Sequence, residues 1–129
     1  MSLSVQVSPL QDAGKGPTAL VKLVGRLDTL TAPQGEKEIQ PVVDGPARNV
    51  IFDLAGLTFI SSAGLRVLLG ARKALGARGA QLHLINLQPQ IAKVLDIVKA
   101  LPGINIFKSV QEMDDYLAAM QRKVEEGGS

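Results

Sequence analysis

Ser61 and Ser62 are the side chains in this sequence best placed to do chemistry. They follow a short apolar run that ends in Asp53, and Gly64-Leu65 after them opens a stretch with leucines at helical spacing. A serine hydroxyl at the start of a helix caps free backbone N–H groups, and the same groups and the helix dipole favour a phosphate. The pair therefore predicts either an inert helix cap or a phosphorylation switch.

Other chemistries are disfavoured by what the sequence lacks. A serine hydrolase using Ser62 and His83 would need an orienting acid and an oxyanion site as well, and the Gly-x-Ser-x-Gly elbow is missing. His83 lies between Leu82 and Leu84, as expected for an ordinary strand histidine. The chain has no cysteine and only one histidine, so neither a thiolate site nor a histidine cluster can form. We predict no catalytic residue, no metal and no cofactor.

Length and composition indicate a single domain and argue against several classes of function. The 129 residues suit one hydrophobic core, and the net charge of +2 is scattered, with only 3% aromatic residues, which argues against nucleic-acid binding. No apolar run is long enough for a membrane span, and the N-terminus lacks a secretion signal, so we expect a cytoplasmic protein. We expect one domain over residues 1–129, ordered over about 3–124, with 125–129 a flexible tail.

Alternating patterns predict a mixed, mainly parallel β-sheet with crossover helices. The strands are expected over residues 4–8, 18–27, 49–54, 81–85 and 104–107, with a hairpin joining the first two. The helices are expected over 31–43 and 62–75, from Pro89 to about 98, and from 109 to about 120.

The acidic residues that follow two of these strands are expected to lie near the serines. Asp28 follows the second strand and Asp53 the third, and sites in open α/β sheets gather beyond the carboxyl ends of the strands. On this reading Asp28 is an exposed loop residue that contributes little to stability, whereas Asp53 orders the loop that leads to Ser61 and Ser62.

Two motifs resemble those of the STAS family, the sulfate transporter and anti-sigma factor antagonist domains. The first runs from Asp53-Leu54 through Phe59-Ile60 to Ser61-Ser62-Ala63-Gly64-Leu65, and the second is Gly25-Arg26-Leu27-Asp28. The order of the remaining elements is similar too, so the resemblance covers nearly the whole chain and implies a STAS-like fold.

The resemblance also implies a function. It implies an anti-sigma factor antagonist that binds an anti-sigma factor with serine kinase activity, is switched off by phosphorylation of Ser62, and is restored by a serine phosphatase. Ser61 stands where family members often carry Asp, so it is the alternative phosphoacceptor. The implied partner-binding residues are Asp28, Ser61, Ser62, Ala63, Gly64, Arg66 and Lys73.

Simpler interpretations remain open beside this one. Gly64 fits close helix packing as well as function, and Arg66 and Lys73 fit a solvated helix face as well as a partner-binding ridge. The whole chain also fits a non-catalytic STAS subunit of a stress-signalling or lipid-transport assembly.

Overall fold

The computed structural model describes residues 2–10, 17–95, 104–107 and 115. They form a five-stranded sheet in the order β1-β2-β3-β4-β5, in which β1 is antiparallel to β2 and every other neighbouring pair is parallel. This confirms the predicted fold class. The strands are β1 (Leu3–Leu10), β2 (Thr18–Leu27), β3 (Asn49–Ile60), β4 (Gln81–Ile85) and β5 (Ile104–Phe107).

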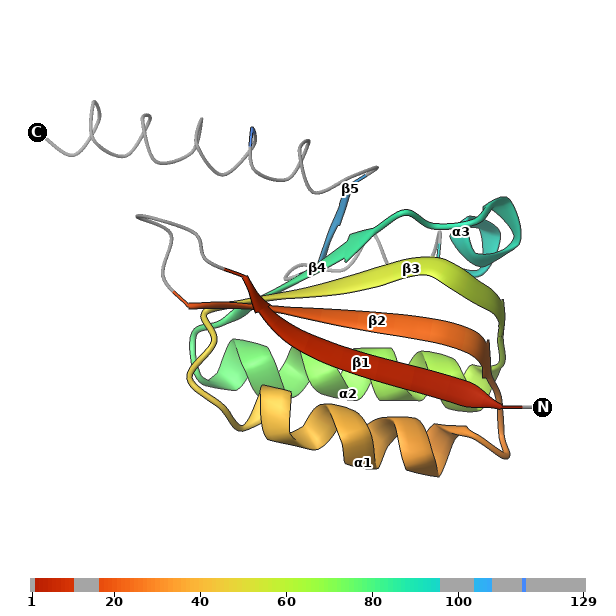
Figure 1. Ribbon diagram of the computed structural model, residues 1–129, viewed down its shortest axis with the longest axis horizontal. Coiled ribbons are helices and arrows are strands. Elements are labelled where there is room, and N and C mark those ends of the chain that lie inside the picture. The colour runs from red at the N-terminus through yellow and green to blue at the C-terminus, as the bar shows by residue number, and fades with distance from the viewer. Residues whose placement is uncertain (1, 11–16, 96–103, 108–114, 116–129) are drawn as a thin grey trace, which may run out of the picture.

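Three helices accompany the sheet: α1 (Ala32–Val43), α2 (Ser62–Ala77) and α3 (Pro89–Leu95). In Figure 1, α1 and α2 lie side by side on one face of the sheet, and α3 lies on the other side. The predicted helix over 109–120 and the tail over 125–129 lie outside the described residues, apart from Asp115. The predicted extent of α3 beyond Leu95 lies outside them as well.

Aliphatic side chains from the sheet and the two helices build the core, as the low aromatic content requires. The first half of β3 is buried on both faces, with Val50, Ile51 and Phe52 all at 0% exposure. Such a continuous apolar run is typical of a central parallel strand. The α1 and α2 faces against the sheet contribute Ile39, Val42, Val43, Val67, Leu68, Ala71 and Leu75.

The prediction that β3 ends at Leu54 is wrong, because the strand continues to Ile60. Ala55-Gly56 looks like the start of a turn, yet pairing with β2 carries on through two shifts of register, one between Lys22 and Val24 and one between Gly25 and Arg26. Such shifts are β-bulges, which bend and twist a strand without ending it.

The second half of β3 pairs with β2 on one side but no longer with β4 on the other. Pairing with β4 stops at Asp53, and beyond that point the amides of two glutamines reach the strand. Gln88 donates from Nε2 to the Ala55 carbonyl at 2.6 Å, and Gln90 donates from Nε2 to the Thr58 carbonyl at 3.3 Å. The start of α3 therefore covers this edge of the sheet.

Arg78, which follows α2, ties the two helices together. Its guanidinium donates to the carbonyls of Val43 at 2.7 Å, Ala47 at 2.6 Å and Val42 at 3.2 Å. Two of these carbonyls belong to the last turn of α1, which is the negative end of that helix's dipole. A single side chain thus fixes the end of α1 against the end of α2.

Candidate functional site

The two serines at the start of α2 have different roles in the fold. Ser61 is the N-cap, with extended backbone (φ −97°, ψ 177°), and its Oγ accepts a hydrogen bond from the Gly64 N–H at 3.3 Å. Ser62 is the first helical residue and is exposed. Among the described residues, none forms a hydrogen bond with the Ser62 hydroxyl. The cap is therefore Ser61, and the hydroxyl open to an enzyme is that of Ser62.

Gly64 packs the start of α2 tightly against the end of β2. A Cβ at this position would overlap the Leu27 carbonyl oxygen and would lie only 2.8 Å from the Leu27 Cγ atom. The same carbonyl accepts a hydrogen bond from the Ser61 N–H at 3.0 Å. The structure therefore shows the close helix packing that was one of the two interpretations of Gly64. This packing places Ser62 beside the loop that follows β2.

Asp28 organises that loop. Its Oδ1 accepts hydrogen bonds from the N–H groups of Leu30 at 3.0 Å and Thr31 at 3.1 Å, and Arg26 Nε lies 3.5 Å from Oδ2. The Thr31 hydroxyl donates to the Arg26 carbonyl at 2.7 Å and accepts from the Asp28 N–H at 2.9 Å. The expectation of an exposed loop aspartate is wrong, because the side chain is only 17% exposed.

These contacts also determine the charge of the carboxylate. Hydrogen bonds from the backbone, that of Thr31 first, hold the pKa of Asp28 below its usual value of 3.8. Asp28 is therefore ionised throughout the neutral range, and its ionised form is the one that holds the loop. Thr31 is the N-cap residue of α1, so Asp28 fixes the entry to that helix as well.

Asp53 does not lie near the serines, and the predicted convergence is wrong for this residue. It lies inside β3, in register with Lys22 and Ile85, whereas Ser61 follows the far end of the strand. At about 3.3 Å per residue the intervening strand is roughly 25 Å long. Asp53 Oδ1 accepts from the Ala55 N–H at 3.0 Å and from Asn86 Nδ2 at 3.2 Å, so its carboxylate holds the turn after β4.

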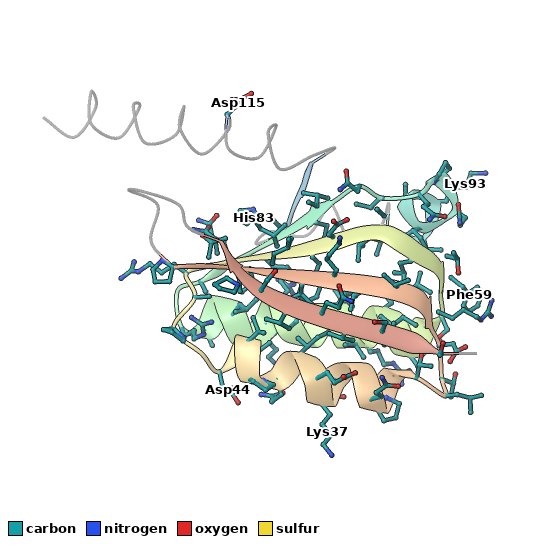
Figure 2. All side chains as sticks on the ribbon, in the orientation of Figure 1. Lys37, Asp44, Phe59, His83, Lys93 and Asp115 are labelled. Atoms are coloured by element: carbon teal, nitrogen blue, oxygen red, sulfur yellow. The ribbon has the colours of Figure 1, made fainter. Side chains whose placement is uncertain are left out.

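His83 is also distant from Ser62. It is fully buried in β4, in register with Ile51 near the start of β3, and its Nε2 lies 3.0 Å from Asn49 Oδ1. Figure 2 shows His83 and Phe59, near the end of β3, toward opposite ends of the sheet. Burial lowers the pKa of His83 to about 4, so the imidazole is neutral. A Ser62–His83 catalytic pair cannot form in this fold.

A groove of about 380 Å³ runs between α1 and α2 and opens at the same end of the domain as Ser62. Ala63 and Arg66 line it from α2, whereas Thr29 and Glu36 line it from the loop and α1. Arg66 lies one turn after Ser62 and is exposed, as is Lys73 two turns further along the helix. The structure therefore brings together the predicted site residues except Asp53 and Lys73. Lys73 lies eleven residues after Ser62 on α2, about 16 Å along the helix, and does not line the groove.

Two hydrogen-bonding groups of this site were not predicted from the sequence: the Leu27 carbonyl and the Thr31 hydroxyl. The spacing Asp28-x-x-Thr31 is a recognisable signal for a local hydrogen-bonded turn before a helix. The Leu27 carbonyl leaves no such signal, because its role depends on where α2 crosses β2. In the part of the chain that is described, no group of acidic or histidine side chains could hold a metal ion, and no helix is long and apolar enough to cross a membrane.

The sequence matches the STAS domain family model over residues 10–113. BtrV of Bordetella bronchiseptica, whose name describes it as an anti-sigma factor antagonist, is 40% identical over 75 residues, covering 58% of this chain and 65% of BtrV. The chain thus spans just under two thirds of that relative. The anti-sigma-B factor antagonist of Staphylococcus aureus is 28% identical over 87 residues, covering 66% of this chain and 81% of that protein.

Solved structures show the same fold. The anti-sigma factor antagonist SpoIIAA in its unphosphorylated form superposes with a TM-score of 0.65 at 22% identity, covering 89% of this chain and 98% of SpoIIAA. Its phosphorylated form, from Bacillus, gives a TM-score of 0.62 at 22% identity, over 88% of this chain and 99% of that one.

Proposed function

The chain belongs to the STAS domain family, and on this premise we propose that it is an anti-sigma factor antagonist controlled by phosphorylation of Ser62. In its unmodified form it binds an anti-sigma factor that is also a serine kinase, and so releases the sigma factor. The kinase uses ATP to phosphorylate Ser62, and a serine phosphatase removes the phosphate. The chain itself catalyses no reaction.

One observation carries the assignment of the modified residue: Ser61 caps α2, whereas Ser62 is exposed at its first position. Phosphorylation of Ser61 would modify the very oxygen that accepts from the Gly64 N–H, on a side chain that is only partly exposed, so the cap would have to rearrange. Modification of Ser62 requires no such rearrangement. The two relatives described above, both named as anti-sigma factor antagonists, support the partner class.

The local chemistry supports a switch that leaves the fold unchanged. A phosphate adds about 1.5 to 2 negative charges at neutral pH, and a helix N-terminus stabilises negative charge. Arg66 lies four residues after Ser62, the spacing at which side chains on a helix meet. The phosphate would therefore be held locally, while a docked partner would meet new bulk and new charge, and mismatched charges across an interface cost several kcal/mol.

Incubation with the cognate kinase and ATP, followed by mass spectrometry, tests the site. Phosphate should appear on Ser62 and be lost in Ser62→Ala, whereas Ser61→Ala should retain most of it. Ser61→Ala should also lower the free energy of unfolding by about 1 kcal/mol, because it removes a cap. Phosphate on Ser61 alone would contradict the assignment.

Binding measurements with the Ser62→Asp variant test the switch. This variant should melt near the temperature of the parent, because an acid at a helix start is tolerated, yet it should bind the kinase more weakly. The effect should be partial, since Asp carries less charge than phosphate. Equal binding by Ser62→Asp and parent would favour a non-catalytic subunit of a larger assembly instead.

A further inference from the structure

Leu30 is by far the most exposed large apolar side chain among the described residues. It is 84% exposed, whereas the next in rank, Val7, is 48% exposed. A single exposed leucine is common on protein surfaces and means little by itself. Its position gives it meaning here, because it lies in the loop between β2 and α1, beside the start of α2.

The loop that carries Leu30 is held in one conformation by its own hydrogen bonds. The Leu30 N–H donates to Asp28 Oδ1 at 3.0 Å, and Thr31 is bonded on both sides, to Asp28 and to the Arg26 carbonyl. A side chain presented on an ordered loop loses little backbone freedom when it is buried by a partner, which is how interface anchors gain affinity. Leu30 is therefore preorganised for burial.

The surface next to Leu30 is the α1–α2 groove, which Arg66 lines from α2 and Glu36 lines from α1. Thr29, its chain neighbour, lines the α1–α2 groove together with Ala63, Arg66 and Gly70. A Cβ at Gly70 would meet nothing within 4 Å, so the groove is open there. The α2 sequence contains three basic residues and no acidic one. Two of them are exposed: Arg66, which lines the groove, and Lys73, which lies outside the groove lining on the same helix.

We propose that Leu30 is the apolar anchor of the partner interface, and that the segment bound there presents an apolar recess to Leu30 and carboxylates to Arg66 and Lys73. The occupant is the anti-sigma factor, so this inference rests on the function proposed above. The positive charge of α2 selects an acidic segment of that protein. A phosphate on Ser62 would draw Arg66 toward itself and lower the positive potential that attracts this segment.

Calorimetric titration of the full chain with the purified kinase tests the anchor. Leu30→Ala should raise Kd by about tenfold or more, the range for truncation of an interface hot spot. Leu30→Met should retain most of the affinity, because it conserves apolar volume. The matched control is Val94→Ala, at a 39% exposed valine on α3, which should bind like the parent. All three variants should keep the parent melting temperature, since both side chains are exposed.

The dependence of kinase binding on salt concentration tests the role of the positive charges on α2. Replacing Arg66 and Lys73 together by Gln should weaken binding at low salt and flatten the dependence of Kd on salt concentration. If the parent binds the kinase and Leu30→Ala binds equally well, Leu30 is not an anchor of the interface, while the proposed function stands. If the parent does not bind the kinase at all, the proposed function fails and the anchor fails with it.

Discussion

Asp28 shows how one carboxylate can support both a fold and a surface. Its Oδ1 accepts two backbone N–H groups, which fix the loop that presents Leu30 and the entry to α1. Its place beside the serines was predictable from a strand end followed by a helix start. Its hydrogen bonding was not predicted as a stabilising feature, because the sequence alone gave no sign that the side chain is mostly covered.

We expect Asp28→Ala to lower the midpoint of urea unfolding at neutral pH, and Asp28→Asn to lower it less, since Asn retains an acceptor oxygen. The pKa of Asp28 is lowered in the fold, so its contribution is complete above the unfolded value of 3.8 and is lost as the pH falls through the lower folded value. The difference between parent and Asp28→Ala should therefore shrink below pH 3.8. A constant difference across this range would mean that the ionised carboxylate is not what stabilises the loop.

The roles of Ser61 and Ser62 could be predicted only as a pair. Both were placed at the start of α2 from the apolar spacing that follows them. Which serine caps the helix depends on which residue has extended backbone, and here it is Ser61, with ψ at 177°. That backbone conformation is set by the hydrogen bond from the Ser61 N–H to the Leu27 carbonyl, a contact 34 positions apart in sequence that local spacing does not encode.

Among the secondary-structure elements, three strands were predicted with their observed bounds, whereas the first strand, predicted over 4–8, extends from Leu3 to Leu10. The predicted bounds of β2, β4 and β5 agree with the structure, as does the end of α1 at Val43. β3 was predicted too short because Ala55-Gly56 has the composition of a turn, whereas pairing with β2 keeps it extended. Tertiary pairing thus overrides the local preference of these two residues.

The contribution of Arg78 to the contact between α1 and α2 can be tested by mutation. We expect Arg78→Ala to lower the free energy of unfolding by about 1–3 kcal/mol, because three hydrogen bonds from a charged donor are lost. Arg78→Lys should recover little of this, since one ammonium group cannot reach three carbonyls in a fork. Urea unfolding measures both changes, with Lys73→Ala on α2 as a control. Equal stability of parent and Arg78→Ala would mean that packing alone joins the two helices.

On the scale of the whole molecule, alternating strands and helices were enough to predict a mixed, mainly parallel sheet. They were not enough to predict where Asp53 would lie relative to Ser62. That relation depends on the length of β3 after Asp53, which in turn depends on two bulges that leave no clear trace in the sequence. The extent of order over residues 3–124 remains a prediction.

The buried His83 makes the stability of the whole domain depend on pH. Its pKa of about 4 in the fold lies below the ordinary 6.5, so the unfolded chain binds the additional proton and the fold loses stability as the pH falls from 6.5 to 4. The loss should reach about 2–3 kcal/mol near pH 4.5. Urea unfolding at pH 7 and 4.5 measures it, and a His83→Gln variant should show a much smaller change between the two pH values. An equal change in both proteins would assign the pH dependence to other groups.

The two glutamines beside β3 have a consequence for how molecules of this protein meet one another. An uncovered strand edge is a template on which another chain can add a strand, and such pairing leads to aggregation. The carbonyls of Ala55 and Thr58 would be two of the acceptors on that template, and Gln88 and Gln90 occupy them from within the same chain. The bulged half of β3 can therefore extend beyond β4 toward the serines without offering these carbonyls to a neighbouring molecule.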